Sequence, residues 1–385
     1  MEDLESFGKF ALQVLDILQP YKNSAIIGIS VMAPILKFSG VRVGPGRAIA
    51  LGMKSLLFPS NNINSVRVPL VKNIWESVVN LAPDIFVVVS GQKGIGKTVA
   101  ISTALRNKCG VVQIDVDAGD SKEDIVRKAL RAIANLQYSF ISPHHSGTRV
   151  IFYYRWMFWS KPILVLNAKE RELNEPYAKI SDAARTLAYD HKLRVIVDGS
   201  DNTLPDSLFA TLRGKIINVD EMAKEVLEDI PELQCFIEKL RNEKLDDVVY
   251  HIVGGVPATY NLLISETRGL DGEDFQNAVD SFLTLLQSKA IVLRGEAELS
   301  HRRVGEIYEL FLKTNSVPRS DKLVRSIERP SPDKTLRSVF IGGDPHLIPS
   351  TKAMAYILNN GCKEIHTVAQ IREIIAVKQN LANLT

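Results

Sequence analysis

The chain has 385 residues, of which 45% are hydrophobic and 24% charged, and its formal net charge is +3. These ordinary values exclude disordered, collagen-like and coiled-coil proteins, and the length allows about two or three domains. The charge is too small to indicate nucleic-acid binding by itself. Three cysteines, Cys109, Cys235 and Cys362, lie far apart without disulfide or zinc spacing. They favour a reducing compartment, and hence an intracellular, cytoplasmic location.

An apolar N-terminal region covers residues 1–65 and ends in the linker-like run PSNNINS. The stretch from Met1 to Pro20 has the spacing of an amphipathic helix. The acidic residues Glu2, Asp3 and Glu5 stand at its start, whereas a secretory signal begins with positive charge. We therefore predict no such signal.

Two further apolar stretches follow within this region. Residues 23–36 are uncharged but fall short of the roughly 18 to 20 residues that span a bilayer, and Pro34 interrupts them. Arg42 to Phe58 is the second stretch. For residues 23–36 a buried helix, a re-entrant or interfacial membrane segment and a targeting role all stay open. Residues 1–60 as a whole could also dock to a protein partner or a membrane.

From Val66 onward, short apolar runs alternate with helical stretches. Val and Ile dominate most of the runs, as in strands buried on both faces. The predicted strands are Ile85–Ser90, Val111–Val116, Pro162–Asn167, Leu193–Asp198 and Lys215–Val219. The predicted helices between and after them are Thr98–Lys108, Ser121–Leu136, Ala178–His191 and Leu204–Arg213. This alternation predicts an α/β fold with a parallel sheet covered by helices on both faces.

The motif GQKGIGKT fits the phosphate-binding pattern G-x-x-x-x-G-K-[ST] between a strand and a helix. Its glycines let the backbone wrap around phosphate oxygens, and its N–H groups and the following helix N-terminus favour anions. Lys97 supplies positive charge to the phosphates, and the Thr98 hydroxyl is placed to bind Mg²⁺. The predicted nucleotide-binding residues are Gly91, Gln92, Lys93, Gly94, Ile95, Gly96, Lys97, Thr98 and Val99.

A P-loop NTPase usually carries an acidic residue at the end of a later strand, where it holds the metal. The run ILVLN best matches that position, and it ends in Asn167, which brings no negative charge. Asn167 is the predicted metal-side residue, and Glu170 or Glu172 could orient the attacking water. Fast hydrolysis is therefore in doubt, whereas nucleotide binding rests on the loop alone.

Other polar residues stand near strand ends. Asp115 and Asp117 could add acidic charge if their strand lay beside the loop strand. Asp198, in VIVDGSD, is a candidate γ-phosphate sensor or simply a turn residue. Arg213 precedes the fifth strand and either reaches phosphate or forms an ion pair at a helix end.

With these residues in place, residues 66–267 resemble a P-loop ATPase of the AAA+/STAND group, of archaeal-ATPase-like type. GQKGIGKT resembles Walker A, PILVLN a Walker B that has lost its Asp, and VIVDGSD sensor 1. The run IVGGVP resembles the G-x-P segment of STAND proteins, which implies a helix starting at Pro257 beside the nucleotide. A plain helix-breaking turn is the other interpretation of this run.

A narrower and weaker resemblance is to the NTPase modules of Crinkler-type effectors and retrotransposon-hot-spot proteins. No Crinkler-type translocation motif is present at the N-terminus. The group resemblance implies ATP rather than GTP, and no guanine-specificity motif follows the fifth strand.

Residues 268–385 are predicted to form a helical or winged-helix-like C-terminal domain, as the resemblance implies. Glu273–Gln287 and Val304–Lys313 have helical patterns, with a short strand predicted at Ala290–Leu293. Basic residues outnumber acidic ones in 301–340, so either phosphate-backbone contact or a solvated loop fits that run.

The sequence therefore predicts an ATP- and Mg²⁺-binding P-loop NTPase that acts as a nucleotide-controlled switch with slow hydrolysis. The predicted catalytic residues are Lys97, Glu170 and Asp198. A non-hydrolysing adaptor, docked through its N-terminal region, is the alternative. A homo-oligomer and a nucleic-acid partner stay open.

Overall fold

The computed structural model describes fourteen stretches of the chain, and Lys93, Glu170, Glu172 and Arg213 lie outside them. The stretches are 47–48, 51, 68–80, 85–92, 94–106, 108–117, 119–134, 143–168, 176–199, 214–300, 304–318, 336–341, 344–360 and 364–382. The predicted helix Leu204–Arg213, most of residues 1–65 and half of the basic run 301–340 also fall outside.

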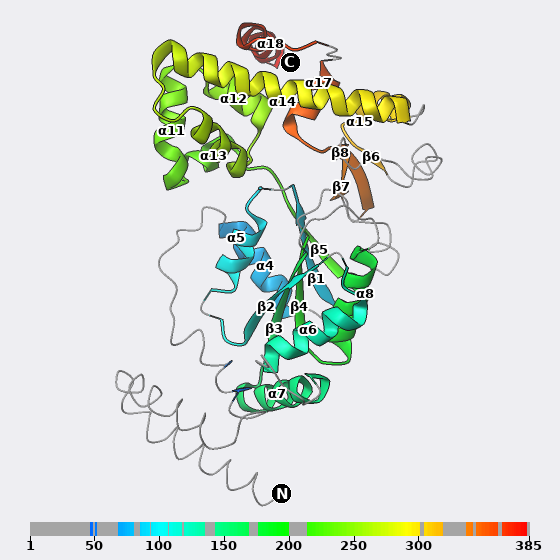
Figure 1. The fold of residues 1–385 in the computed structure, drawn as a ribbon. Coiled ribbons are helices and arrows are strands. Elements are labelled where there is room, and N and C mark those ends of the chain that lie inside the picture. Colours follow the sequence, from blue (N-terminus) through cyan, green and yellow to red (C-terminus); the bar gives the residue numbers. More distant parts are fainter. Residues whose placement is uncertain are drawn as a thin grey trace, which may run out of the picture.

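A five-stranded parallel sheet forms the centre of the molecule (Figure 1). Its strands are β1 (Phe86–Gly91), β2 (Val111–Val116), β3 (Ile163–Ala168), β4 (Arg194–Gly199) and β5 (Gly214–Val219). Their order across the sheet is β2-β3-β4-β1-β5. Each strand lies within one residue of its predicted bounds, and the predicted α/β fold class is confirmed.

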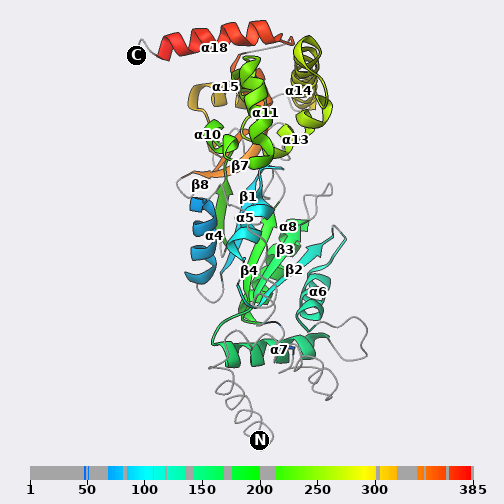
Figure 2. The same ribbon diagram turned by 90° about the vertical axis from the view of Figure 1, so that its left-hand side faces the viewer.

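Helices cover both faces of this sheet (Figure 2). Alternate strand residues face opposite sides, so Val87 and Val89 pack with α4 (Val68–Asn80) and α5 (Lys97–Ala104). The other face packs against α6 (Lys122–Ala134) and α8 (Pro176–Tyr189), and α7 (Pro143–Phe158) lies against α6. The sequence analysis missed α7, whose β-branched and aromatic residues have weak helix propensity. Burial of Val150, Ile151 and Tyr154 on one helix face outweighs that weakness.

Beyond β5 the chain is mainly helical, as expected. The helices are α10 (Lys224–Glu228), α11 (Pro231–Asn242), α12 (Asp246–Val253), α13 (Pro257–Glu266), α14 (Gly272–Ser300), α15 (Val304–Thr314), α17 (Lys352–Asn359) and α18 (Val368–Ala382). A small antiparallel sheet, in the order β6-β8-β7, consists of β6 (Val317–Pro318), β7 (Leu336–Ile341) and β8 (Asp344–Pro349). The chain thus has the parallel-sheet core, with its phosphate-loop motif after β1, and the mainly helical C-terminal region that the sequence predicted.

One hydrophobic cluster runs through this whole C-terminal part, from Met222 to Ile371. It includes α10 to α13, which the sequence analysis assigned to the NTPase core at 66–267. The domain boundary at residue 267 stays a prediction.

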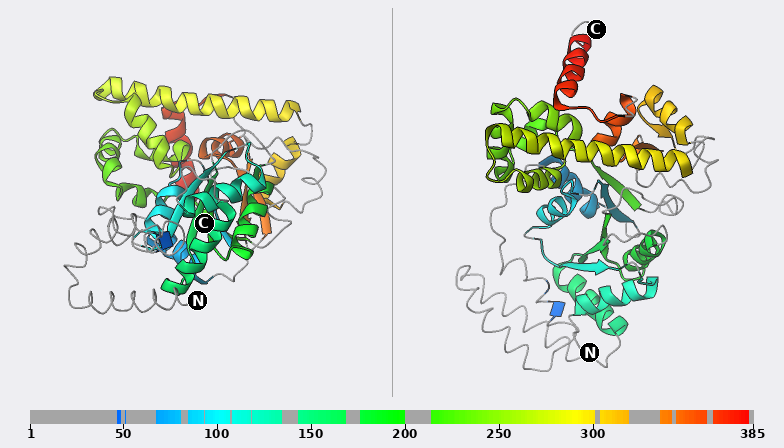
Figure 3. Two further views of the ribbon diagram at one scale, coloured as in Figure 1. Left: turned by 60° about the horizontal axis from the view of Figure 1, so that its bottom comes forward. Right: turned by 45° about the horizontal axis from the view of Figure 1, so that its top comes forward.

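The long helix α14 spans the C-terminal part in both views of Figure 3. Its course shows that the strand predicted at Ala290–Leu293 is wrong, because these residues continue α14. Phe275, Val279 and Leu283 are buried at helical spacing, and Ala290 extends the same face. A four-residue apolar run does not distinguish a strand from a buried helix. The helical spacing of the buried residues along the whole of Gly272–Ser300 shows that it is a helix.

A few residues of the N-terminal region are also described, and they pack against the sheet domain. Ala48 and Leu51 are buried in the core beside α6. Arg47 donates from Nε to the Ile133 carbonyl at 3.1 Å, and Gly110 N donates to Leu51 O at 3.1 Å. For these few residues of 1–65, the structure supports the interpretation of burial against the core. In the described part of the chain, every helix is too short or too polar to cross a membrane.

Candidate functional site

The loop between β1 and α5 has the backbone that a phosphate-binding loop needs. Gly94 and Gly96 have φ angles of +78° and +94°, which residues with a Cβ rarely adopt. Gly96 is the N-cap of α5, and no side chain caps that helix. Because the first turn of a helix leaves N–H groups without intrahelical acceptors, the loop presents donors to an anion.

Lys97 lies within this loop and is only 5% exposed. Its ammonium donates to the carbonyl oxygens of Gly91 at 2.7 Å and Gln92 at 2.9 Å. Gln92 is buried, and its Oε1 has no hydrogen-bond partner in the described structure. Ile95 points into the core, so only its backbone faces the loop, and the Val99 side chain is exposed.

Thr98, the last residue of the motif, contacts Asp198 at the end of β4. The Thr98 hydroxyl donates to Asp198 Oδ2 at 2.6 Å. Asp198 is 2% exposed, and its Oδ1 has no hydrogen-bond partner among the described residues. Burial raises the pKa of Asp198, although the Thr98 hydrogen bond and the charge of Lys97 act in the opposite direction. A buried carboxylate with one oxygen unpaired is suited to a cation or its bound water.

The strand register explains why β4, rather than β3, supplies this carboxylate. Asp115, Asn167 and Asp198 are aligned across β2, β3 and β4, and Asp198 lies directly beside Val89 of the loop strand. Asn167 turns away from the loop, since its amide donates to Asp115 Oδ1 at 2.9 Å.

The acidic residues of β2 are separated from the loop strand by two strands. Asp115 and Asp117 were expected to add charge to the loop only if β2 lay beside the loop strand β1. It does not, since β3 and β4 lie between them. Asp117 instead forms an ion pair with Lys128 at 2.9 Å.

The G-x-P segment reaches the phosphate-binding loop. Pro257 occupies the first turn of α13, where its missing N–H is not needed. Ala258 N donates to Gly94 O at 3.3 Å, and a Cβ added at Gly94 would lie 2.5 Å from Ala258 Cβ. The structure thus brings together the loop and a helix that lie more than 150 residues apart in sequence.

A second contact ties this segment to the end of the sheet. Met222 N donates to Gly255 O at 3.0 Å, and a Cβ on Gly255 would lie 1.8 Å from Met222 O. Only glycine therefore fits at position 255, because any side chain there would overlap the backbone of Met222.

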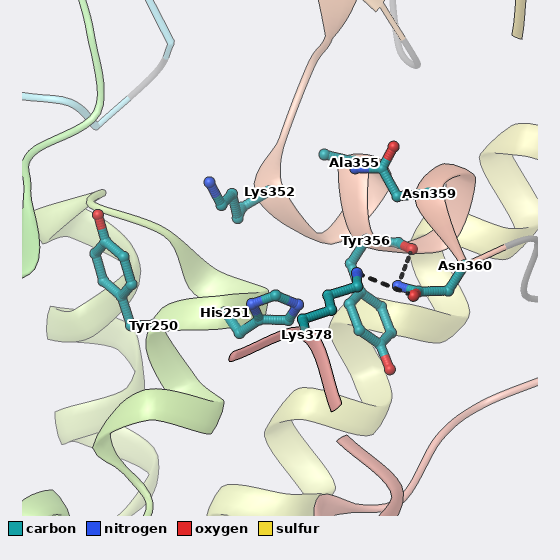
Figure 4. A pocket seen from close by; sticks show the side chains of 8 residues that line it. All are labelled: Tyr250, His251, Lys352, Ala355, Tyr356, Asn359, Asn360 and Lys378. Atoms are coloured by element: carbon teal, nitrogen blue, oxygen red, sulfur yellow. Dashed lines mark hydrogen bonds between the residues drawn. The ribbon is translucent and has the colours of Figure 1, made fainter. Parts of the chain in front are cut away.

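A cavity of about 220 Å³ lies on the far side of this turn, between α12, α17 and α18 (Figure 4). His251 stands at its centre, between Tyr250 and Tyr356, with Lys352 and Lys378 beside it. The Tyr250 hydroxyl donates to Met222 O at 3.0 Å, so the cavity wall is connected to the turn. Sequence reasoning missed this cavity, because its residues come from separate helices without a shared motif.

The residues present fit ATP and Mg²⁺. Two buried oxygens without partners, Gln92 Oε1 and Asp198 Oδ1, belong to the loop and its neighbouring strand. Close packing around Gly94 and the uncapped start of α5 supply the backbone cradle.

No protein-family model matches this chain, and no curated protein matches it. Among solved structures, it is similar to Cdc6p from Pyrobaculum aerophilum, with 13% identity, a TM-score of 0.38 and coverage of 83% of this chain and 96% of that one. It is also similar to katanin, in a structure concerned with katanin self-assembly. The identity is 11% and the TM-score 0.32, and the match covers 57% of this chain and 77% of that one. Drosophila ORC bound to DNA is a third, with 13% identity, a TM-score of 0.26 and coverage of 81% and 91%. At these identities and scores the similarity concerns general shape, and any conclusion about function rests on the residues of this chain.

Proposed function

We propose that this protein binds ATP with Mg²⁺ and works as a nucleotide-controlled switch with slow hydrolysis. The observation that carries the proposal is the meeting of Lys97, Thr98 and Asp198 at one loop. A lysine, a hydroxyl and a carboxylate there are the groups that P-loop proteins use to bind nucleotide phosphates and their metal.

Each residue has a distinct role in this proposal. The loop N–H groups and Lys97 hold the phosphates, and Lys97 exchanges its contacts with loop carbonyls for phosphate oxygens. Thr98 Oγ1 and Asp198 hold the metal side, so Asp198 takes the role that the sequence analysis gave to Asn167. Mg²⁺, when bound, neutralises the charge that develops on the phosphoryl oxygens. Glu170 keeps its predicted role in orienting water.

The switch is proposed to act through the contact between the loop and α13. Ala258 N donates to Gly94 O, and a side chain at position 94 would collide with Ala258. A phosphate that reshapes the loop therefore moves or strains the start of α13. Met222 and Gly255 pass that change to the rest of the C-terminal part, which shares one core.

A non-hydrolysing adaptor is the second candidate function. It is favoured by Asn167, an amide where an acidic residue is usual, which pairs with Asp115 away from the loop. In that case the same loop binds ATP, and the nucleotide stabilises a form that docks a partner. Homo-oligomerisation and nucleic-acid binding remain hypotheses in either case.

Steady-state ATP turnover, measured together with binding of a fluorescent ATP analogue, tests the proposal. Mg²⁺-dependent binding with slow turnover supports the switch. Binding without turnover supports the adaptor, and absence of binding contradicts both.

A further inference from the structure

Three large aromatic side chains are exposed on one face of α7 and at its end. Phe152 is 64% exposed, Trp156 51% and Trp159 94%. Phe152 and Trp156, four residues apart, lie one turn apart on the same face of α7. Trp159 follows the last residue of the helix, Phe158, and has a left-handed backbone with φ of +49°. Isolated exposed rings are common, but three large rings within eight residues favour an interaction surface at this end of α7.

Basic residues surround this patch. Segments 143–168 and 189–195 contain five Lys or Arg residues and a single acid, Asp190, which gives +5 − 1 = +4. The basic residues are Arg149, Arg155, Lys161, Lys192 and Arg194. Burial first, and then the charges of Arg155, Arg194 and Lys192, lower the pKa of Lys161.

Contacts between α7 and the turn before β4 join the two segments into one surface. Arg194 N donates to Pro162 O at 2.9 Å, and Thr148 Oγ1 lies 3.5 Å from His191 Nδ1. Lys192 lies 4.4 Å from the centre of the Tyr189 ring, which adds a fourth exposed ring. We name this set, from α7 and residues 189–194, the basic-aromatic surface.

The surface lies at the opposite end of the sheet from the nucleotide site. Residues 161 and 194 stand at the amino ends of β3 and β4, whereas the P-loop follows the carboxyl end of β1. In Figure 1, α7 lies across the end of the sheet domain that is remote from the C-terminal helices. Binding at this surface therefore leaves the P-loop accessible.

We propose that the basic-aromatic surface binds the surface of an anionic lipid bilayer. Trp and Tyr rings favour the boundary between headgroups and hydrocarbon, and Lys and Arg attract anionic headgroups. Rings along one helix face reach a flat boundary together. Single-stranded nucleic acid is the other anionic candidate, but its binding proteins stack successive bases inside a charged groove rather than along a helix face. The occupant that fits both the rings and the charges is a lipid surface.

The chain contains its own reporters for the test. Two of its three tryptophans, Trp156 and Trp159, belong to the surface, whereas Trp75 is half-buried against Lys108 at 4.0 Å. The full chain is mixed with vesicles of phosphatidylcholine, with or without phosphatidylserine, some carrying brominated acyl chains. Tryptophan quenching and co-sedimentation are recorded, and a single-stranded oligonucleotide is tested as a competitor.

The proposal expects binding and quenching only with phosphatidylserine present. Replacing both rings, as Trp156→Ala with Trp159→Ala, should lower the partition constant by about tenfold or more. Each of Arg155→Gln and Lys192→Gln should lower it by about fivefold at low salt. Leu299→Ala and Lys289→Gln, on exposed positions of α14, are the matched controls and should have no effect.

Several results would overturn the proposal. One is binding that ignores phosphatidylserine, and another is binding that survives loss of both rings, which would assign membrane contact to residues 1–60. A third is tryptophan emission that is already blue-shifted without vesicles and does not change when vesicles are added. That result would show that another part of the chain, or a second copy, covers the rings. Oligonucleotide binding in place of vesicle binding would assign the surface to nucleic acid. Trp75 fluorescence in the variant that carries both Trp156→Ala and Trp159→Ala checks that its fold is intact.

Discussion

Thr98 donates its hydroxyl hydrogen to Asp198 across 2.6 Å, joining the last residue of the P-loop to the end of β4. The second oxygen of this buried carboxylate has no partner in the described structure. The site therefore holds one acceptor committed to Thr98 and one available to a metal-bound water. In the proposed function this pair, rather than Asn167 on β3, holds the Mg²⁺ side of the nucleotide.

The first prediction concerns Asp198→Asn, which should abolish Mg²⁺-dependent tightening of ATP binding while raising stability without nucleotide. The pKa of Asp198 is raised in the folded state, so its ionised form costs more free energy there than in the unfolded chain. Because a raised carboxyl pKa makes the protein relatively more stable as pH falls, removing the charge should stabilise the chain at pH 7. Thermal unfolding with and without Mg·ATP measures both effects.

Thr98→Val is the companion variant, since it removes the same hydrogen bond from the other side. It should also lose the Mg²⁺ effect, but it should lower stability, because both Asp198 oxygens are then buried without partners. A Mg²⁺ effect that persists in Asp198→Asn would show that this carboxylate lies away from the metal.

The second prediction is that Asn167→Asp leaves Mg²⁺ affinity unchanged and lowers stability. The Asn167 amide donates to Asp115, so an aspartate there would place two carboxylates side by side. Mg²⁺ titration with ATP present, together with urea unfolding, checks both parts. Clearly tighter Mg²⁺ binding would restore β3 as the metal strand and contradict the role given to Asp198.

The third prediction is that Gly94→Ala weakens ATP binding and lowers the melting temperature. The new Cβ would lie 2.5 Å from Ala258 Cβ, and the backbone at position 94 has φ of +78°. Gly94→Ala combined with Ala258→Gly should recover part of the loss, leaving the strain of about 1 kcal/mol from the left-handed backbone. Binding titrations on all four forms give the coupling, and full additivity would argue against contact between the loop and α13.

The fourth prediction concerns how the stability of the protein depends on pH through His251, which lines the cavity of the C-terminal part. Burial, with Lys378 and Lys352 nearby, lowers the pKa of His251 in the folded state. The unfolded chain then binds a proton more readily, so stability should fall as pH drops below the unfolded value of about 6.5. Histidine titration by NMR should show a higher pKa in Lys352→Gln and in Lys378→Gln. A pKa of His251 that neither variant changes would contradict the assigned cause.

Most of the P-loop NTPase core could be predicted from the sequence. The runs IFVVVS and VVQIDV are nearly continuous and rich in Val, so their strand identity depends little on tertiary context. The GQKGIGKT motif carries its own geometry, because its glycines permit the backbone angles and its last two residues begin α5. Local pattern was therefore enough for the loop and for the strands around it.

The partnership of Thr98 with Asp198 could not be predicted in the same way. VIVDGSD and PILVLN have the same pattern of apolar residues followed by a polar one, and only strand order decides which lies beside the loop. That order comes from non-local pairing, which the sequence does not display. The one local signal is that, of these two runs, only VIVDGSD keeps a carboxylate at its end.

The central claim is that residues 91–98 bind the phosphates of ATP, and one measurement tests it most directly. Calorimetric titration of Mg·ATP into the wild-type chain and into Lys97→Ala should show binding that the substitution removes or weakens strongly. Each charge-assisted hydrogen bond from the Lys97 ammonium to a phosphate oxygen is worth roughly 1.5 to 3 kcal/mol. The circular dichroism spectrum should stay the same, because α5 and β1 do not need the ammonium to form. Equal affinity for Mg·ATP in the two proteins, with unchanged spectra, would contradict the assignment of this loop as the nucleotide site.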